Sequence, residues 1–237
     1  TEAATTYDRI NLSMIPDKYH PWVTYKSSWA HVEAGDFDKG VSGFYTFMNE
    51  YAKDQPNLVP KVLAKRGEAF RKVKDYRNAI KDFDAIVALN QDEKLVYLAM
   101  QQKALIMVER ENSEGTVEAF QSLLDKFPEG IGSSEANFFI GDAKYKLNEY
   151  EEAVPFLTKA RELDEATYAI PATRRIIVCQ WRLSDTDKAA EAVDFLLARD
   201  PKTNLVPPKL WLWLGTRFFQ RDRYEEAARY LKQVANP

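Results

Sequence analysis

The sequence predicts an all-α protein, a solenoid of antiparallel helix pairs, and three observations support this prediction. Three position types recur at an interval of 74 residues (141−67 and 215−141): Gly67, Gly141 and Gly215; Tyr76, Tyr150 and Tyr224; Ala79, Ala153 and Ala227. Ala104 lies 37 residues after Gly67 and 37 before Gly141, which halves the interval. Short turns and prolines, rather than long loops, separate the helical segments.

The order of the repeated residues predicts how each pair is built. The glycine lies where the two helix backbones approach closely, because it has no side chain to keep them apart. The tyrosine packs at the turn, and the alanine receives the neighbouring helix. Gly40 and Gly43 lie inside the second helix of the first pair, and each is expected to weaken that helix by about 1 kcal/mol relative to alanine.

Length and composition limit the class of protein. The chain has 237 residues, of which 45% are hydrophobic and 13% aromatic, enough for a substantial core. The 33 basic and 36 acidic side chains give a net charge of −3, so we expect no general attraction to nucleic acid or anionic lipid. No run reaches the roughly 18 consecutive apolar residues of a membrane-spanning helix, so we expect no transmembrane segment.

The domain organisation follows from the spacing. Residues 1–22 contain Pro16 and Pro21 and show no sustained periodicity, which indicates a leader that packs on the first pair. Residues 23–237 are expected to form a single solenoid domain with helix pairs at 23–56, 60–90, 92–128, 134–165, 170–201 and 207–236. The chain begins at Thr1 rather than at methionine, so we expect that a start, a signal segment or a neighbouring domain has been removed.

At this point the chain resembles the tetratricopeptide repeat family, whose units are 34-residue helix-turn-helix motifs. The last unit matches the signature W-x-x-L-G-x-x-F followed by Y-x-x-A-x-x-x-L, with Trp211, Leu214, Gly215, Phe218, Tyr224, Ala227 and Leu231. The second unit supplies Leu63, Gly67, Phe70, Tyr76, Ala79 and Phe83. The resemblance covers about residues 23–234, in about six repeats. Their spacing of 36 to 39 residues exceeds the family's 34.

The resemblance implies a non-enzymatic scaffold that binds a protein or peptide partner in a concave groove. It places the first helix of each pair on the inner wall, with groove-facing side chains three before, one after, and four or five after the glycine position. The candidate partner-binding residues on this count are Arg71, Gln101, Phe138, Tyr145, Arg174, Trp181, Arg182 and Phe219. We expect Tyr145, Trp181 and Phe219 to take apolar side chains of the partner, and the arginines to pair with its acidic groups.

Two alternatives to this assignment stay open. An extension of the chain itself could fill the groove. The assignment of groove-facing positions could also be shifted by one residue, in which case the aromatic residues belong to the core.

Catalytic, metal and cofactor sites are not expected. His20 and His31 are the only histidines, eleven residues apart, and no ligand spacing accompanies them. Cys179 is the single cysteine and reads as a buried apolar residue. A different hypothesis makes the chain the helical scaffold arm of a larger enzyme or envelope assembly whose catalytic part lies elsewhere.

A third hypothesis is RNA binding through the basic stretch of the second unit, which contains Lys61, Lys65, Arg66, Arg71, Lys72, Lys74 and Arg77. At helical spacing these charges scatter around the helix, so a solvated face is the preferred interpretation. The ending FQSLLDKFPEG resembles repeats of bacterial envelope proteins, which favours a periplasmic or envelope location over the cytoplasm. The aromatic, uncapped last pair suggests a homodimer through the C-terminal repeat.

Overall fold

The computed structural model describes residues 2–128, 132–201 and 204–235, and within them all regular structure is helical. This confirms the all-α prediction. Residues 1 and 236, which begin the expected leader and end the last expected pair, lie outside the described residues. The chain forms two compact units, residues 1–110 and 111–237, and each is described by itself.

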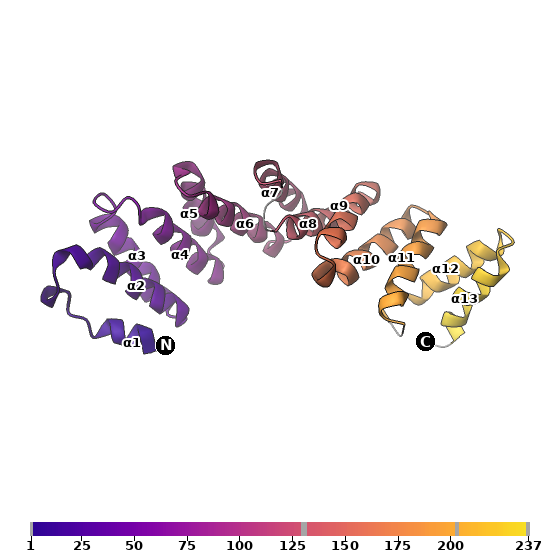
Figure 1. Cartoon of the computed structure of the whole chain (residues 1–237), viewed down its shortest axis with the longest axis horizontal. Helices are drawn as coiled ribbons and strands as arrows, with labels where there is room; N and C mark the ends of the chain where they lie inside the picture. Colours follow the sequence, from indigo (N-terminus) through magenta and orange to yellow (C-terminus); the bar gives the residue numbers. More distant parts are fainter. Residues whose placement is uncertain (1, 129–131, 202–203, 236–237) are drawn as a thin grey trace. The chain divides into compact units, whose positions relative to one another are not determined.

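The first unit begins with a short helix, α1 (Glu2–Asp8), which packs against α2 (Figure 1). Two single 3₁₀ turns, Leu12–Met14 and Asp17–Tyr19, connect the two helices. The remaining helices are α2 (His20–Glu33), α3 (Phe37–Glu50), α4 (Val59–Lys72), α5 (Tyr76–Leu89) and α6 (Glu93–Glu109). Neighbours in sequence pack together from α2 to α6, and α6 also contacts α4.

The second unit consists of α7 (Ser113–Lys126), α8 (Ser133–Lys146), α9 (Tyr150–Leu163), α10 (Glu165–Arg182), α11 (Thr186–Arg199), α12 (Pro208–Phe219) and α13 (Tyr224–Ala235). Each helix packs on the next, and α10 also contacts α8. The contacts α4 with α6 and α8 with α10 place the first helices of adjacent pairs side by side. Each unit therefore has a face made of first helices.

The helices of a pair cross closely at the repeated glycines. A methyl group added at Gly67 would lie 2.8 Å from a ring carbon of Phe83, and one at Gly141 would lie 2.6 Å from Leu157. The last pair repeats this with Gly215, 2.5 Å from Leu231. The opposing residue is always sixteen positions later, so the predicted close approach is confirmed.

The first pair places its glycines on the other helix. A methyl group at Gly43 of α3 would lie 2.1 Å from the Ser28 hydroxyl of α2, and one at Gly40 would lie 2.5 Å from Val32. The sequence analysis treated these glycines only as weak points of the helix. Their role is to let α2 and α3 approach where the serine replaces the usual glycine.

In each of six turns, the second residue before the following helix has a positive φ angle; these residues are Gly35, Lys74, Glu111, Asn148, Ser184 and Asp222. In the turns of Gly35, Lys74, Asn148, Ser184 and Asp222, the next residue donates its backbone N–H to a carbonyl five residues earlier, as Asp75 does to Phe70 at 2.8 Å. This is the Schellman type of helix end. Asp36, Asp75 and Asp185 follow such turns, and each caps the next helix with its carboxylate.

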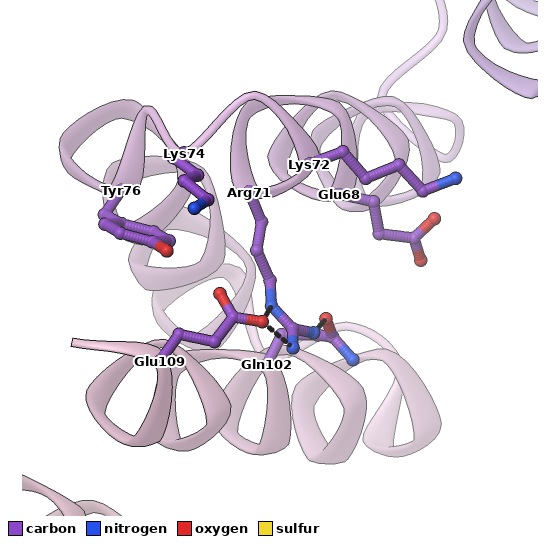
Figure 2. Close-up of a pocket in the computed structure, with 7 residues that line it drawn as sticks. All are labelled: Glu68, Arg71, Lys72, Lys74, Tyr76, Gln102 and Glu109. Carbon is purple, nitrogen blue, oxygen red and sulfur yellow. Dashed lines mark hydrogen bonds and ion pairs between the residues drawn. The ribbon is translucent and has the colours of Figure 1, made fainter. Parts of the chain in front are cut away.

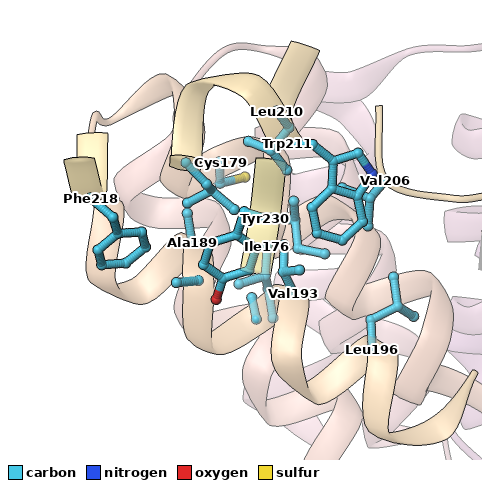
Figure 3. Close-up of a cluster of buried hydrophobic side chains, with 14 of the residues drawn as sticks. Ile176, Cys179, Ala189, Val193, Leu196, Val206, Leu210, Trp211, Phe218 and Tyr230 are labelled. Carbon is cyan, nitrogen blue, oxygen red and sulfur yellow. The ribbon is translucent and has the colours of Figure 1, made fainter. Parts of the chain in front are cut away.

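The second unit has a continuous apolar core over α9 to α13 (Figure 3). Trp211 and Phe218 of α12 stack on Tyr230 of α13, with ring centroids 6.1 and 5.6 Å apart. Cys179 of α10 is fully buried in this core, and burial raises the pKa of its thiol to about 12. The predicted burial of Cys179 is confirmed.

The first unit holds a charged pair in its interior. Arg66 of α4 donates from Nε to Oδ2 of Asp82 at 2.8 Å and from Nη2 to Oδ1 at 2.7 Å. Arg66 is 9% exposed and Asp82 of α5 is 3% exposed. The guanidinium also lies 4.7 Å over the ring of Tyr45. A basic residue that the sequence analysis assigned to a solvated face is therefore part of the core.

Candidate protein-binding surfaces

Arg71 of α4 lies in a pocket of about 640 Å³ against α6 (Figure 2). Its Nε and Nη2 donate to Oε1 of Glu109 at 3.0 and 2.5 Å, and its Nη1 donates to Gln102. Lys72 and Lys74 complete the basic side of the pocket. Because Glu109 already neutralises Arg71, a partner carboxylate has to displace an internal one to bind this arginine.

The structure brings Gln102, rather than the predicted Gln101, into this pocket. Gln101 is half-buried on the same helix, α6. The two residues differ by about 100° around the helix, which is enough to change the surface that each one meets. The placement of Gln101 as a partner-binding residue stays a prediction.

An aromatic and basic surface on α2 and α4 was missed. The ammonium group of Lys26 lies 4.5 Å over the ring of Trp29 and 5.7 Å over that of Trp22, and Lys65 approaches Trp29 at 4.8 Å. Glu68 binds Lys65 at 2.9 Å and also lines the Arg71 pocket. Trp29 lies one residue after Ser28, which holds the glycine position, so applying the groove count to the first pair would have found it.

In the second unit, Tyr145 of α8 lies under Arg175 of α10, with the guanidinium 5.0 Å from the ring. Arg175 donates to Asp142 at 2.5 Å, and Lys146 approaches the other oxygen of that carboxylate at 2.8 Å. Burial raises the pKa of Asp142, but the hydrogen bonds from Lys146 and Arg175 outweigh burial, so its pKa lies below the usual value. Tyr145 and Asp142 thus form one charged and aromatic surface with the neighbouring helix.

Three predicted residues lie on one stripe of α10. Trp181 is half-buried against the apolar core, and the Arg182 guanidinium lies 5.8 Å from its ring. Arg174 is exposed and lies seven residues, about two helical turns, before Trp181. Within the described residues, neither Arg174 nor Arg182 has a carboxylate partner. The arginine engaged by Asp142 is the adjacent Arg175.

The two remaining predicted aromatic residues have different surroundings. Phe138 of α8 is half-buried and stacks on Tyr168 of α10, with centroids 4.9 Å apart. Phe219, at the end of α12, is 59% exposed and contacts the ring of Tyr224 edge-on at 5.4 Å. Phe138, Tyr145 and Trp181 therefore contribute part of their surface to packing, and Phe219 is the most accessible of the four.

The other hypotheses have less support. Of the basic stretch in the second pair, Arg66 is buried, and Lys65 and Arg71 are paired with glutamates. The described residues contain no group of three or more side chains that could hold a metal ion. No helix in residues 2–128, 132–201 or 204–235 is long and apolar enough to cross a lipid bilayer.

Comparisons with known proteins agree with the helix-pair architecture. Family models described as tetratricopeptide repeat match residues 134–167 and 180–237. No curated protein sequence matches the chain significantly. Solved structures do match. One is a tetratricopeptide repeat protein from Parabacteroides merdae, with 16% identity, a TM-score of 0.62, and coverage of 90% of this chain and 78% of that one.

A second similar structure is MamA from Desulfovibrio magneticus RS-1, with 19% identity, a TM-score of 0.59, and coverage of 79% of this chain and 99% of that one. At this level of identity, the likeness shows the fold. Tetratricopeptide repeat proteins are typically non-catalytic scaffolds for protein interactions. The two matching segments show that residues 134–167 and 180–237 are tetratricopeptide repeats, and the helix pairs and repeated positions support the same repeat fold for the rest of the described chain.

Proposed function

We propose that the chain is a non-enzymatic scaffold that binds an acidic peptide segment or helix of a partner protein along α8 and α10. One observation carries the proposal: Arg174 and Arg182 flank the half-buried Trp181 and have no carboxylate partner among the described residues. Exposed arginines beside an aromatic side chain are typical centres of protein interfaces.

The spacing of the stripe specifies the ligand. Arg174, Trp181 and Arg182 are at positions i, i+7 and i+8, so they share one side of α10. The two arginines are about 12 Å apart along the helix axis, at 1.5 Å per residue. A complementary segment therefore has two acidic side chains about 12 Å apart and an apolar side chain beside the one that meets Arg182. Tyr145 on α8 extends the same surface.

The test compares two double variants. Arg174→Ala with Arg182→Ala removes the unpaired charges, and Lys159→Ala with Lys209→Ala removes two exposed charges elsewhere in the unit. Partners are captured in cells by crosslinking and identified by mass spectrometry, and their affinities are then measured for each variant. We expect the arginine pair to weaken binding at least tenfold and the lysine pair to leave it unchanged. Equal binding by both variants would contradict the proposal.

Trp181→Ala decides between a binding and a packing role for the tryptophan. Loss of affinity with a small change in melting temperature assigns Trp181 to the partner. A large fall in melting temperature assigns it to the core, as the alternative in the sequence analysis states. The arginine pair is exposed, so its result does not depend on this outcome.

A further inference from the structure

The fifth pair departs from the repeat at one inner position, three residues after the glycine position. In the second and sixth pairs this residue is a buried phenylalanine, Phe70 or Phe218. In the fourth pair it is Lys144, whose ammonium group is held by Glu149 at 3.0 Å and Glu152 at 2.5 Å. In the fifth pair it is Gln180, which is less bulky than phenylalanine and has no such partner.

A cavity of about 310 Å³ lies at Gln180, between α9, α10 and α11. Its lining residues have helical spacing on each helix: Thr158 and Arg161 come from α9, Ile176 and Gln180 from α10, and Lys188 and Phe195 from α11. At this position the second and sixth pairs have a phenylalanine, which is bulkier than Gln180. The size of the cavity is at the lower end of ligand pockets and suits one side chain.

Two polar groups in this cavity lack protein partners. Gln180 is 5% exposed, and its carboxamide forms no hydrogen bond with any described residue. Arg161 lies 4.3 Å over the ring of Phe195, and within the described residues no carboxylate pairs with it. The polar atoms of the carboxamide are accessible to solvent, and Arg161 is half-buried. Water can satisfy the carboxamide, but water leaves the charge of Arg161 unpaired.

The remaining groups decide which ligand fits. Thr158 adds a hydroxyl, and Lys188 adds an ammonium group that Asp185 shares at 3.0 Å. Glu191 is the one carboxylate in the lining, and it is exposed. Donors thus outnumber acceptors, and Ile176 and Phe195 provide an apolar wall for methylene groups. An acidic side chain with a short apolar stem complements this arrangement.

We propose that this cavity binds a glutamate side chain of a partner protein, whose carboxylate accepts hydrogen bonds from Arg161 and Gln180. The site is distinct from the stripe on α10, because Gln180 is about 200° around the helix from Arg182 at 100° per residue. The chain then has a second recognition surface, formed by the second helices α9 and α11 over α10. Neither binding surface requires the other, so either proposal can fail alone.

The test uses blocked amino acids on the whole chain. N-acetyl-glutamate N-methylamide is titrated into the ¹⁵N-labelled protein, and the Gln180 side-chain amide and the backbone amides of α9 to α11 are followed by NMR. We expect shifts confined to these helices with a dissociation constant in the millimolar range, typical of so small a ligand. The glutamine analogue, which has no charge, is expected to bind at least tenfold more weakly. Equal binding of both compounds, or shifts elsewhere, would overturn the proposal.

Variants give an independent check. Gln180→Phe copies Phe70 and Phe218 and fills the cavity, so binding is lost while the melting temperature stays the same or rises. Arg161→Met keeps the contact with Phe195 but removes the charge, so affinity for the glutamate compound falls at least tenfold. Lys209→Ala, an exposed charge on α12 outside both proposed surfaces, is the matched control and leaves affinity unchanged. Unchanged binding by either Gln180→Phe or Arg161→Met contradicts the site.

Discussion

The second and fourth helix pairs use the same two positions in opposite ways. Arg66 and Asp82 form a buried ion pair between α4 and α5. Seventy-four residues later (140−66 and 156−82), the corresponding residues of α8 and α9 are Ile140, which is fully buried, and Phe156, which is half-buried. The repeat fold therefore accepts either a charged or an apolar contact at this crossing.

The difference shows what the fold itself requires. An ion pair must lose its hydration on burial, and the attraction between the charges only offsets that loss when the geometry is good. The two hydrogen bonds of 2.8 and 2.7 Å meet this condition in the second pair. The apolar version needs no such geometry. The charged pair is then a local feature of α4 and α5 and not a requirement of the repeat.

The largest expected effect comes from breaking the ion pair on one side. Asp82→Ala leaves the Arg66 guanidinium buried without a counter-ion, which is expected to reduce the free energy of unfolding by about 3–5 kcal/mol. The measurement is urea unfolding followed by circular dichroism. Arg66→Ile combined with Asp82→Phe copies the fourth pair, and we expect it to recover most of this loss. A double variant as unstable as Asp82→Ala would show that the apolar residues of the fourth pair cannot replace the ion pair in the second.

The sequence predicted local motifs well, but it did not predict which side chains of different helices meet. Gly67, Gly141 and Gly215 were sufficient for the helix pairs, because each pair is a local motif and the close crossing needs a residue without a side chain. The burial of Arg66 was not predicted, because the pattern of charges along one helix does not show that Asp82 of the next helix faces it. The turns were predicted, but their positive φ angles were not, because Lys74 and Ser184 give no composition signal for a positive φ.

The candidate site was predicted only in part. Counting groove-facing positions from the glycine predicted which helix of each pair lines the groove and which of its residues face it. This count placed Arg71 and Trp181 on first helices. It named Gln101 and Arg174, whereas the contacts with Arg71 and Asp142 are made by Gln102 and Arg175, which lie about 100° further around each helix. The partners that distinguish them, Arg71 for Gln102 and Asp142 for Arg175, lie on the first helix of the preceding pair. The assignment of these groups therefore needed tertiary structure.

A second prediction concerns the ion pair of Asp142 and Arg175, which joins two adjacent helix pairs rather than the two helices of one pair. The folded-state pKa of Asp142 is lowered, so its charge stabilises the fold above the unfolded pKa of about 3.9. This contribution is lost as the pH falls through the folded-state pKa. At pH 7 we expect Asp142→Asn to reduce the free energy of unfolding by roughly 1–2 kcal/mol. The deficit should vanish at a pH below the folded-state pKa, measured as unfolding free energy against pH.

Asp187 offers an exposed ion-paired carboxylate with which to compare the buried Asp142. Hydrogen bonds from Arg223 and Arg221 also lower its pKa, but its side chain is 59% exposed, against 11% for Asp142. Solvent screens such a pair, so Asp187→Asn is expected to change stability by a few tenths of a kcal/mol. Equal pH profiles for the two variants would show that burial does not set the strength of these pairs.

The last comparison concerns two turns that share one backbone shape. Gly35 in the first unit has φ +83°, and no atom lies within 4 Å of the position of an added methyl group. Ser184 in the second unit has φ +59° and is exposed. A side chain in this region strains the backbone by about 1–2 kcal/mol, partly offset because glycine makes the unfolded chain more flexible. Ser184→Gly should therefore stabilise the protein by up to about 1 kcal/mol, and Gly35→Ala should destabilise it by a similar amount, both measured as shifts in the urea midpoint. Shifts of the same sign would mean that contacts at the turns, rather than backbone strain, set the difference between the two positions.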